Sequence, residues 1–358
     1  MSLQEKHWMV TLQQVFYPAL AAVGLPCKYR INVSVELKKL QIFTDTSCFF
    51  SANIVTFLII LRRNCMLSKS SSLYLMAISV ADNLVLIFIV VIELSLKYHQ
   101  WEPFWSYEPW CNLRDIFTYG AYNASTWLVV VFTAERFIAI HTRTLKTKVC
   151  TQRHAAWTVT SVFVFSHLCA IPYYWSNASV RQNNQTVCIY DHAALPFFIH
   201  TLVWLQTLQS YIVPFLIILT LNGLTLRLIS LSNRVHTTSH VTSEVKSRIS
   251  PLLRSRKRKS IVLLVTISMS FVLLSVTRAI TQILLRTTHM YKMDRNDYSV
   301  GLNVVADIGT MLCLSNAAAN MYLYVCTQGK FRREFFACVR RVFIFICEAQ
   351  PQTGAATS

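Results

Sequence analysis

The chain has 358 residues, of which 54% are hydrophobic and 14% are charged. This composition is too apolar for a set of soluble domains and indicates a membrane protein. A net charge of +18 would suggest a nucleic-acid partner for a soluble protein, but the basic residues cluster between apolar stretches, so no nucleic acid is expected as a partner. Eleven cysteines spread over such a chain exclude a disulfide-rich scaffold.

Six apolar stretches are long enough to cross a bilayer, for which a helix needs about 20 residues. We expect these spans at about 73–96, 112–140, 155–175, 197–230, 260–286 and 300–325. An earlier apolar region is interrupted, because Val15–Pro26 is too short to cross and Thr46–Leu61 follows a charged stretch. The predicted fold class is therefore an all-α membrane protein, a seven-transmembrane helix bundle whose first span is damaged or shifted.

The distribution of positive charge predicts the topology, because Lys and Arg accumulate in short cytoplasmic loops. With the N-terminus outside, 21 of the 34 Lys and Arg residues fall on the inner side. The sequons at Asn32, Asn177 and Asn184 then lie outside and are predicted glycosylation sites. A fourth match, at Asn123, lies within a span and is interpreted as a chance occurrence. We expect a multi-pass protein of the plasma membrane with a cytoplasmic C-terminus.

Several short motifs occur in a characteristic order along these spans. They are Leu75–Asp82 in the second span, Glu135-Arg136-Phe137 at the end of the third, Trp157 in the fourth, Pro214 in the fifth and Asn320–Tyr324 at the end of the seventh. In this order and placement they resemble the rhodopsin-like (class A) G protein-coupled receptors. The resemblance implies a receptor that binds a small extracellular ligand within the helix bundle and activates a heterotrimeric G protein.

A narrower resemblance rests on shorter stretches of sequence. Leu67-Ser-Lys-Ser, Ile171–Trp175 and Asp307-Ile, together with the segment after Phe137, are similar to the orphan receptors grouped with the aromatic-amino-acid-sensing receptors, in particular a diverged branch in fishes. This similarity implies an aromatic amino acid or a peptide-like molecule as the ligand.

The polar residues of the second, third and seventh spans are implied by the resemblance to form a sodium pocket. Asp82 lies at membrane depth, where an ionisable side chain is costly and must face the interior of the bundle. Its expected partners are Ser125, Asn316 and Asn320. An alternative is that Asp82 is satisfied by hydrogen bonds between helices, without an ion.

At the cytoplasmic end, the resemblance implies that Glu135 and Arg136 exchange partners when a G protein docks. The alternative is a surface salt bridge, which would contribute little. Asn222 and Lys257 stand where many relatives have a tyrosine and a carboxylate, and Tyr324 closes the seventh span. We therefore predict a weakly locked receptor with ligand-independent activity.

The resemblance also implies an extracellular disulfide between Cys111 and Cys188, and the outer face is oxidising. Cys27 and Cys48 could form a second one. After the seventh span, residues 331–338 predict a short amphipathic helix on the membrane surface, where lipids are partners and Cys338 or Cys347 could be palmitoylated.

The candidate ligand site lies in the outer half of the bundle. Thr118 occupies the position where amine receptors carry an aspartate, which argues against a biogenic amine. The other candidates are Tyr122, Tyr211, Arg278 and Asp307. An arginine within a span requires a partner, so Arg278 is expected either to pair with Asp307 or to bind a ligand carboxylate, and the two readings stay open.

Two departures from the family pattern put the activation hinge in doubt. The sixth span has Leu274-Ser-Val-Thr277 where relatives have a tryptophan and a kinking proline, and Met321 replaces the proline of the seventh span. A receptor that folds but does not signal is therefore one alternative. A secondary transporter is another, although no broken helices or inverted repeats are visible. We identify no catalytic constellation and expect no enzyme activity and no cofactor.

The charged segment at about 27–51 is an anomaly, because its lysines and acidic residues cannot lie in hydrocarbon. Its ends can be encoded by splice-donor and splice-acceptor sequences, so our hypothesis is a retained intron. The alternative is a genuine extended N-terminus, with the first span starting near Thr44. The expected domains are an extracellular N-terminus over 1–43, the receptor domain over 44–326, and a cytoplasmic helix and tail over 327–358.

Overall fold

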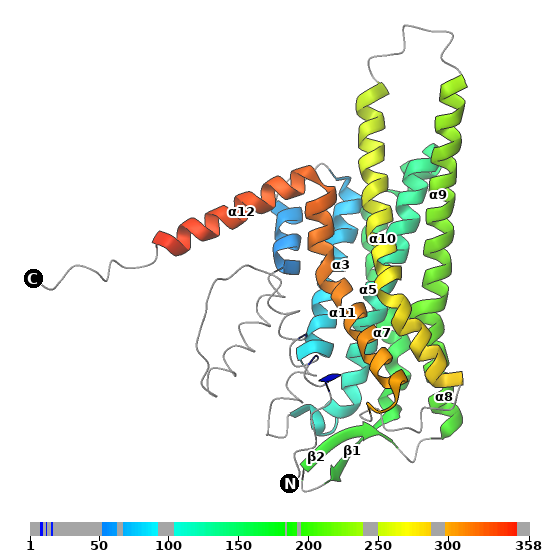
Figure 1. The fold of residues 1–358 in the computed structure, drawn as a ribbon, viewed down its shortest axis with the longest axis vertical. Helices are drawn as coiled ribbons and strands as arrows, with labels where there is room; N and C mark the ends of the chain where they lie inside the picture. Colours follow the sequence, from blue (N-terminus) through cyan, green and yellow to red (C-terminus); the bar gives the residue numbers. More distant parts are fainter. Residues whose placement is uncertain are drawn as a thin grey trace, which may run out of the picture.

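The computed structural model describes residues 8–9, 12, 16, 52–62, 67–91, 104–182, 185–191, 195–238, 250–287 and 298–348. Within them, the chain forms a bundle of roughly parallel long helices, with a hairpin at one end and a helix that leaves the bundle at the other end (Figure 1). The predicted anomaly at 27–51, and with it Asn32, Cys27 and Cys48, lies outside the described residues.

Six helices in the described ranges are long and apolar enough to cross a membrane. They comprise α3 (Lys69–Val85), α5 (Trp110–His141), α7 (Gln152–Ala170), α8 (Pro196–Thr207) with α9 (Val213–Thr238), α10 (Ser250–Thr287) and α11 (Gly301–Thr327). The other segments are the apolar helix Ala52–Arg62, the 3-10 turns Phe104–Ser106 and Ile171–Ser176, α6 (Arg143–Val149) and α12 (Gly329–Glu348). The all-helical bundle predicted from the sequence is confirmed, with Ala52–Arg62 as the described part of the first span.

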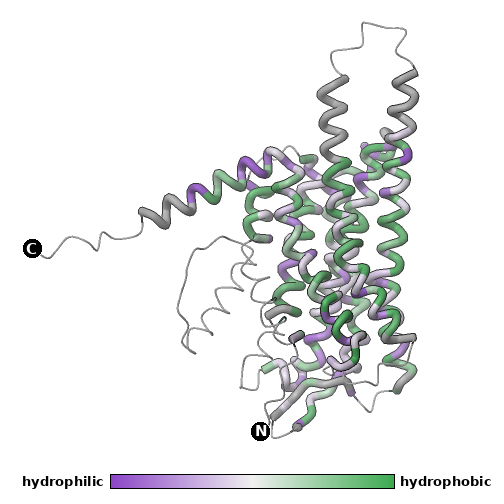
Figure 2. Tube along the Cα trace, in the orientation of Figure 1, coloured by the Kyte–Doolittle hydropathy of each residue, from purple (hydrophilic) through white to green (hydrophobic). Residues whose placement is uncertain are grey.

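The bundle helices carry hydrophobic residues along most of their described length, whereas hydrophilic and hydrophobic residues alternate along α12 (Figure 2). This alternation matches the helix predicted to lie on the membrane surface after the last span. The helix begins at Gly329, directly after α11, so the expected short helix is confirmed.

Helix ends and irregular turns follow from local sequence. Ser68 and Thr151 cap α3 and α7 by accepting hydrogen bonds from the backbone N–H of Ser71 and His154. A π-helical segment, Leu208–Ile212, joins α8 to α9 just before Pro214. Proline has no N–H for the preceding turn, so a wider turn is a physical consequence of its position. A second π-helical segment, Leu86–Val91, extends α3.

The apolar core lies between α3, α5, α9 and α10, where Tyr74, Leu128, Phe132, Ile218 and Leu264 are fully buried. Helices α10 and α11 approach especially closely. A Cβ atom added at Gly309 of α11 would lie 2.8 Å from the backbone nitrogen of Arg278 in α10. A glycine is needed there because any side chain would collide with backbone atoms.

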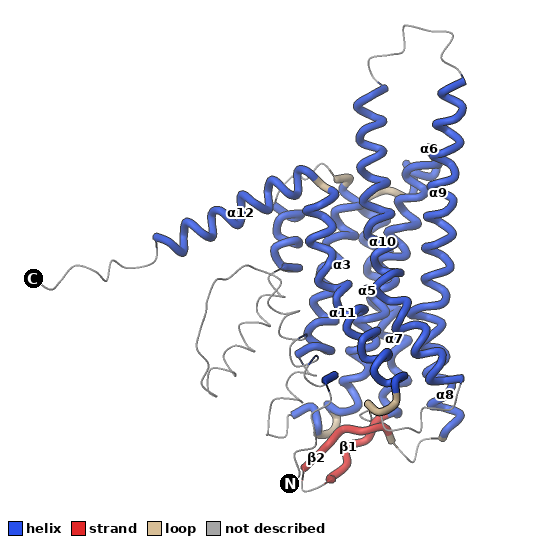
Figure 3. The backbone as a smooth tube through the Cα atoms, viewed as in Figure 1, coloured by secondary structure: helices blue, strands red, loops and turns tan. Residues whose placement is uncertain are grey.

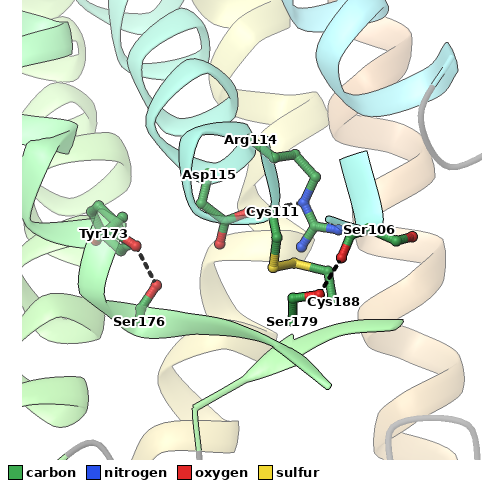
Figure 4. The surroundings of a disulfide bond; sticks show 8 residues. All are labelled: Ser106, Cys111, Arg114, Asp115, Tyr173, Ser176, Ser179 and Cys188. Atoms are coloured by element: carbon green, nitrogen blue, oxygen red, sulfur yellow. Dashed lines mark hydrogen bonds and ion pairs between the residues drawn. A yellow bond between two sulfur atoms is a disulfide. The ribbon is translucent and has the colours of Figure 1, made fainter. Parts of the chain in front are cut away.

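The extracellular end carries an antiparallel hairpin of β1 (Asn177–Gln182) and β2 (Gln185–Tyr190), in which Ser179 is paired with Cys188 (Figure 3). The hairpin was not predicted from the sequence. The disulfide between Cys111 and Cys188 confirms the expected bridge and ties β2 to the start of α5 (Figure 4). Ser179 also donates a hydrogen bond to the carbonyl of Ser106, at 2.6 Å.

Candidate functional site

The outer half of the bundle holds an arginine between two tyrosines. Arg278 of α10 donates a hydrogen bond from Nε to the hydroxyl of Tyr211, at 2.8 Å. Its guanidinium lies 5.9 Å from the ring centroid of Tyr122 in α5, within the range of a cation–π contact. The two tyrosine rings are themselves 6.0 Å apart. Three of the five predicted ligand residues are therefore brought together.

The other two predicted ligand residues have different contacts. The Asp307 carboxylate accepts a hydrogen bond from the hydroxyl of Tyr298, at 2.8 Å. The Thr118 hydroxyl donates a long bond of 3.5 Å to the carbonyl of Phe88. Because Arg278 contacts tyrosines and Asp307 contacts Tyr298, the structure does not show the ion pair between α10 and α11 that was one of the two readings of Arg278.

Cys313 lies next to Tyr122, and sequence reasoning did not identify it. Its sulfur is 3.0 Å from the Tyr122 hydroxyl and 3.6 Å from the Ser275 hydroxyl. Below this group is a cavity of about 10 Å³ that extends to Asp82, Ser125 and Asn316. This volume is about the minimum that holds one water molecule. The cavity therefore lies between the Tyr122–Cys313 contact and the polar core.

The predicted polar core is assembled around Asp82. One carboxylate oxygen accepts a bond from Ser125, at 2.6 Å, and the other accepts a bond from Asn320, at 2.7 Å. The side-chain oxygen of Asn316 is buried and has no hydrogen-bond partner among the described residues. A carboxylate, a hydroxyl and an unpartnered amide oxygen around a small cavity are suitable ligands for a sodium ion, so these residues fit the group that the resemblance implies.

At the cytoplasmic end, Arg136 forms an ion pair with its neighbour Glu135. Their side chains are only 9% and 3% exposed, so the alternative of a surface salt bridge is wrong. Ser70 of α3 donates to the Glu135 carboxylate, at 2.8 Å, and accepts from Arg136, at 3.3 Å. The pair is thereby held against α3. Such buried charges are stabilised only while their hydrogen bonds are satisfied.

Other predicted residues of this region link neighbouring helices. Asn222 of α9 donates a 2.7 Å hydrogen bond to the Ser268 hydroxyl of α10. Tyr324 is buried and packs edge to face on Phe331 of α12, with 5.6 Å between the ring centroids. Lys257 belongs to the inner part of α10, and its side chain lies outside the described residues.

A polar cluster in the middle of the bundle was missed by sequence reasoning. Asn123 of α5 exchanges hydrogen bonds with Gln206 of α8, at 3.1 and 3.3 Å, and accepts another from Ser210. Gln206 also accepts from Tyr173 in the 3-10 turn Ile171–Ser176, at 3.4 Å. The available signal was the presence of Asn, Gln and Ser at membrane depth, where polar groups require partners.

Asn123 is buried, in agreement with the interpretation of its sequon as a chance match. Asn177, a predicted glycosylation site, is only 6% exposed, and its amide nitrogen is buried without a hydrogen-bond partner among the described residues. A glycan requires this nitrogen to be accessible, so the burial argues against that prediction. Asn184 lies outside the described residues.

Residues 52–324 match the family model described as "7 transmembrane receptor (rhodopsin family)". The match covers more than half of the chain. It begins at the apolar helix Ala52–Arg62 and ends at Tyr324, and it therefore includes the polar core, the Arg278 region and the Glu135–Arg136 pair. It supports the family as a whole and no subgroup within it.

Proposed function

Because the chain belongs to the rhodopsin family of seven-transmembrane receptors, we propose that it responds to a small extracellular ligand that carries a carboxylate. As a member of this family it is a multi-pass G protein-coupled receptor and not an enzyme. The ligand class and the residues that bind the ligand are the parts that we propose.

The observation that carries the proposal is the environment of Arg278. Its polar contact is with the hydroxyl of Tyr211, and no carboxylate in the described part of the chain pairs with it. A guanidinium at membrane depth without an acidic partner is costly. A ligand carboxylate would form the bidentate, charge-assisted hydrogen bonds that guanidinium groups favour.

The same region suits an aromatic ligand body. Tyr122 and Tyr211 present their rings beside Arg278, and aromatic pairs prefer such tilted or offset geometries. Asp307, near the outer end of α11, is the acidic residue that we propose for a ligand ammonium group. An aromatic amino acid carries all three features, namely a carboxylate, a ring and an ammonium group.

The test is nucleotide exchange on a heterotrimeric G protein in membranes that contain the full chain, with L-phenylalanine and L-tryptophan as ligands. We expect Arg278→Met to abolish the response, because the carboxylate loses its counter-ion. Arg181→Gln, which removes an exposed arginine of the hairpin, is the matched control and should respond like the wild-type protein. An unchanged response of Arg278→Met would contradict the proposed role.

For signalling, we propose that the ion pair between Glu135 and Arg136 separates when a G protein docks. We also propose that the receptor is held only weakly in its inactive state before docking. Two neighbouring features support this idea. Among the described residues, one side-chain hydrogen bond joins α9 to α10, from Asn222 to Ser268. Lys257 replaces an acidic partner for Arg136. The expected result is nucleotide exchange without ligand, in proportion to surface expression.

A receptor that reaches the surface and shows neither basal nor ligand-dependent exchange would instead support the alternative of a non-signalling receptor. For a secondary transporter, the corresponding result would be uptake of labelled amino acid without nucleotide exchange.

A further inference from the structure

A second cavity, of about 450 Å³, opens at the extracellular end of the bundle. It lies among residues at the start of α5, in the 3-10 turn Ile171–Ser176, in the hairpin and its end, and at the start of α8. It shares no lining residue with the small cavity between Tyr122 and Asp82. Its volume falls within the range of small-molecule sites, which is roughly 300–1,000 Å³.

The described lining of the cavity carries two carboxylates. Glu108 and Asp191 line it, and no lysine, arginine or histidine is among its described lining residues. The backbone N–H of Asp191 donates to the carbonyl of Ser176, at 3.0 Å, which fixes the chain beside the cavity. The nearby Arg114 forms an ion pair with Asp115, at 3.3 Å, so its charge is directed to another carboxylate (Figure 4).

Aromatic side chains form another part of the wall. Tyr174, Trp175 and Phe198 line the cavity. The rings of Tyr174 and Trp175 are edge to face, with centroids 5.6 Å apart. Trp175 is 60% exposed, so much of its surface is open to a ligand. Aromatic faces attract organic cations through the ring quadrupole. This attraction adds to that of the two carboxylates.

Two buried amide groups in the wall lack partners. The Asn177 side chain is only 6% exposed, and its amide nitrogen has no hydrogen-bond partner in the described part of the chain. The side-chain oxygen of Asn112 is likewise buried and unpartnered. Buried polar groups are nearly always hydrogen-bonded, and leaving them unpaired is costly. A small rotation of the two side chains toward the cavity would let a ligand with one acceptor and one donor satisfy both.

We infer that this extracellular cavity is a second ligand site, which binds a small aromatic organic cation. The ammonium group binds at the acidic wall of Glu108 and Asp191, and the ring packs against Trp175. Once the Asn177 side chain turns toward the cavity, its amide donates to a carbonyl near the ammonium group. This site binds a positively charged group, whereas the Arg278 site binds a carboxylate. The inference therefore goes beyond the proposed function, because a ligand of this site needs no carboxylate.

The probe that separates the two sites is L-phenylalaninamide, which keeps the ring, the ammonium group and a carbonyl but has no carboxylate. We would measure saturable binding of the radiolabelled compound to the purified full chain in lipid nanodiscs. Its N-acetyl derivative, which is uncharged, should not compete. Glu108→Gln and Asp191→Asn should each weaken binding roughly tenfold or more, because each removes a charged hydrogen-bond partner.

The controls use variants of the same kind elsewhere. Glu334→Gln, an equal charge change in α12, should bind the probe like the wild-type protein. Arg278→Met should also bind it normally, even where it abolishes the response to phenylalanine. Trp175→Ala changes an exposed side chain, so it tests the site without a risk to folding, and it should weaken binding severalfold.

Absence of saturable binding to the wild-type protein would overturn the inference. Binding that is lost in Arg278→Met but unchanged in Glu108→Gln and Asp191→Asn would overturn it too, because the probe would then occupy the bundle. Loss in the acidic-wall variants and in Trp175→Ala, with normal binding in Arg278→Met, would support it even if the proposed carboxylate ligand proved wrong.

Discussion

Gly309 offers a sensitive test of how α10 and α11 pack beside Arg278. In Gly309→Ala, the new methyl group would lie 2.8 Å from the backbone nitrogen and 3.0 Å from the Cα of Arg278, and 3.1 Å from the carbonyl carbon of Thr277. All three neighbours are backbone atoms. They cannot rotate away as a side chain could, so the two helices must separate by a few tenths of an ångström.

The cost of such overpacking is about 1–3 kcal/mol. Each kcal/mol shifts the midpoint of thermal unfolding by roughly 2–4 °C for a domain of this order of size, so we expect a fall of about 2–12 °C. The matched control is Gly223→Ala in α9, where an added Cβ meets no atom within 4 Å. There the replacement should stabilise the helix by about 0.5–1 kcal/mol, because glycine is a poor helix former.

The measurement is the loss of helical circular dichroism on heating the purified chain in detergent, at one scan rate for all variants. We expect opposite signs for the two glycines. If Gly309→Ala unfolds at or above the wild-type temperature, the close backbone approach of α10 to α11 is refuted. If both variants unfold earlier, the effect reflects substitution within a helix rather than this contact.

The Cys150 thiol should react slowly with iodoacetamide at neutral pH, because burial and the neighbouring Glu135 carboxylate raise its pKa to about 11. Alkylation should be faster in Glu135→Gln, and an unchanged rate would contradict this cause. Since the thiol ionises near 9.0 in the unfolded chain and near 11 in the folded one, its contribution to the free energy of unfolding is complete below about pH 9 and is lost as the pH rises to about 11. Asn123→Ala and Gln206→Ala should each lower the free energy of unfolding by about 1–3 kcal/mol, since each leaves a buried partner unsatisfied. The double variant should lose less than the sum, and strict additivity in the cycle would show that the two side chains do not interact. Asp82→Asn should make nucleotide exchange insensitive to replacement of sodium by N-methylglucamine, whereas Ser315→Ala, whose hydroxyl bonds to Met311 within α11, should keep the wild-type sensitivity.

The spans could be predicted from the sequence because length and hydropathy determine which segments cross a membrane. The expected ranges agree with the helices to within a few residues at most ends, for example 112–140 against Trp110–His141. The disulfide and the assembly of Asp82 with Ser125 and Asn320 came from the family resemblance. Composition alone would have named neither of them.

Hydropathy could not predict how each helix is rotated about its axis, and therefore which residues face one another. The π-helical segment Leu208–Ile212 contains Tyr211 and changes the facing of every residue after it, so the face of α8 cannot be extended into α9 by a period of 3.6 residues. For this reason the contact of Tyr211 with Arg278 was not predicted, and Asp307 remained an alternative partner. The hairpin was missed because its strands are only six residues long. Polar and apolar residues alternate in the first strand only from Asn177 to Arg181, and the second strand ends in the apolar run Val187–Tyr190. Patterns this short do not distinguish a strand from other structure.

The continuous form of α10 indicates which contact stabilises the inactive state of the receptor. Residues 252–287 contain no proline, and the helix runs unbroken from Ser250 to Thr287. A proline hinge therefore cannot separate its outer half, which carries Arg278, from its inner half, which carries Ser268. We therefore expect a movement at Arg278 to reach the Asn222–Ser268 hydrogen bond as a motion of the whole helix.

Ser268→Ala tests this idea, because it removes the hydroxyl that accepts the 2.7 Å bond from Asn222. A net hydrogen bond contributes about 1 kcal/mol. If the bond exists only in the inactive state, its loss should raise the active population, and with it basal nucleotide exchange, by up to about fivefold. Ser270→Ala is the control, since that hydroxyl bonds to the Ile267 carbonyl of its own helix. Equal basal exchange in the two variants, at equal surface density, would show that the bond between α9 and α10 does not hold the receptor inactive.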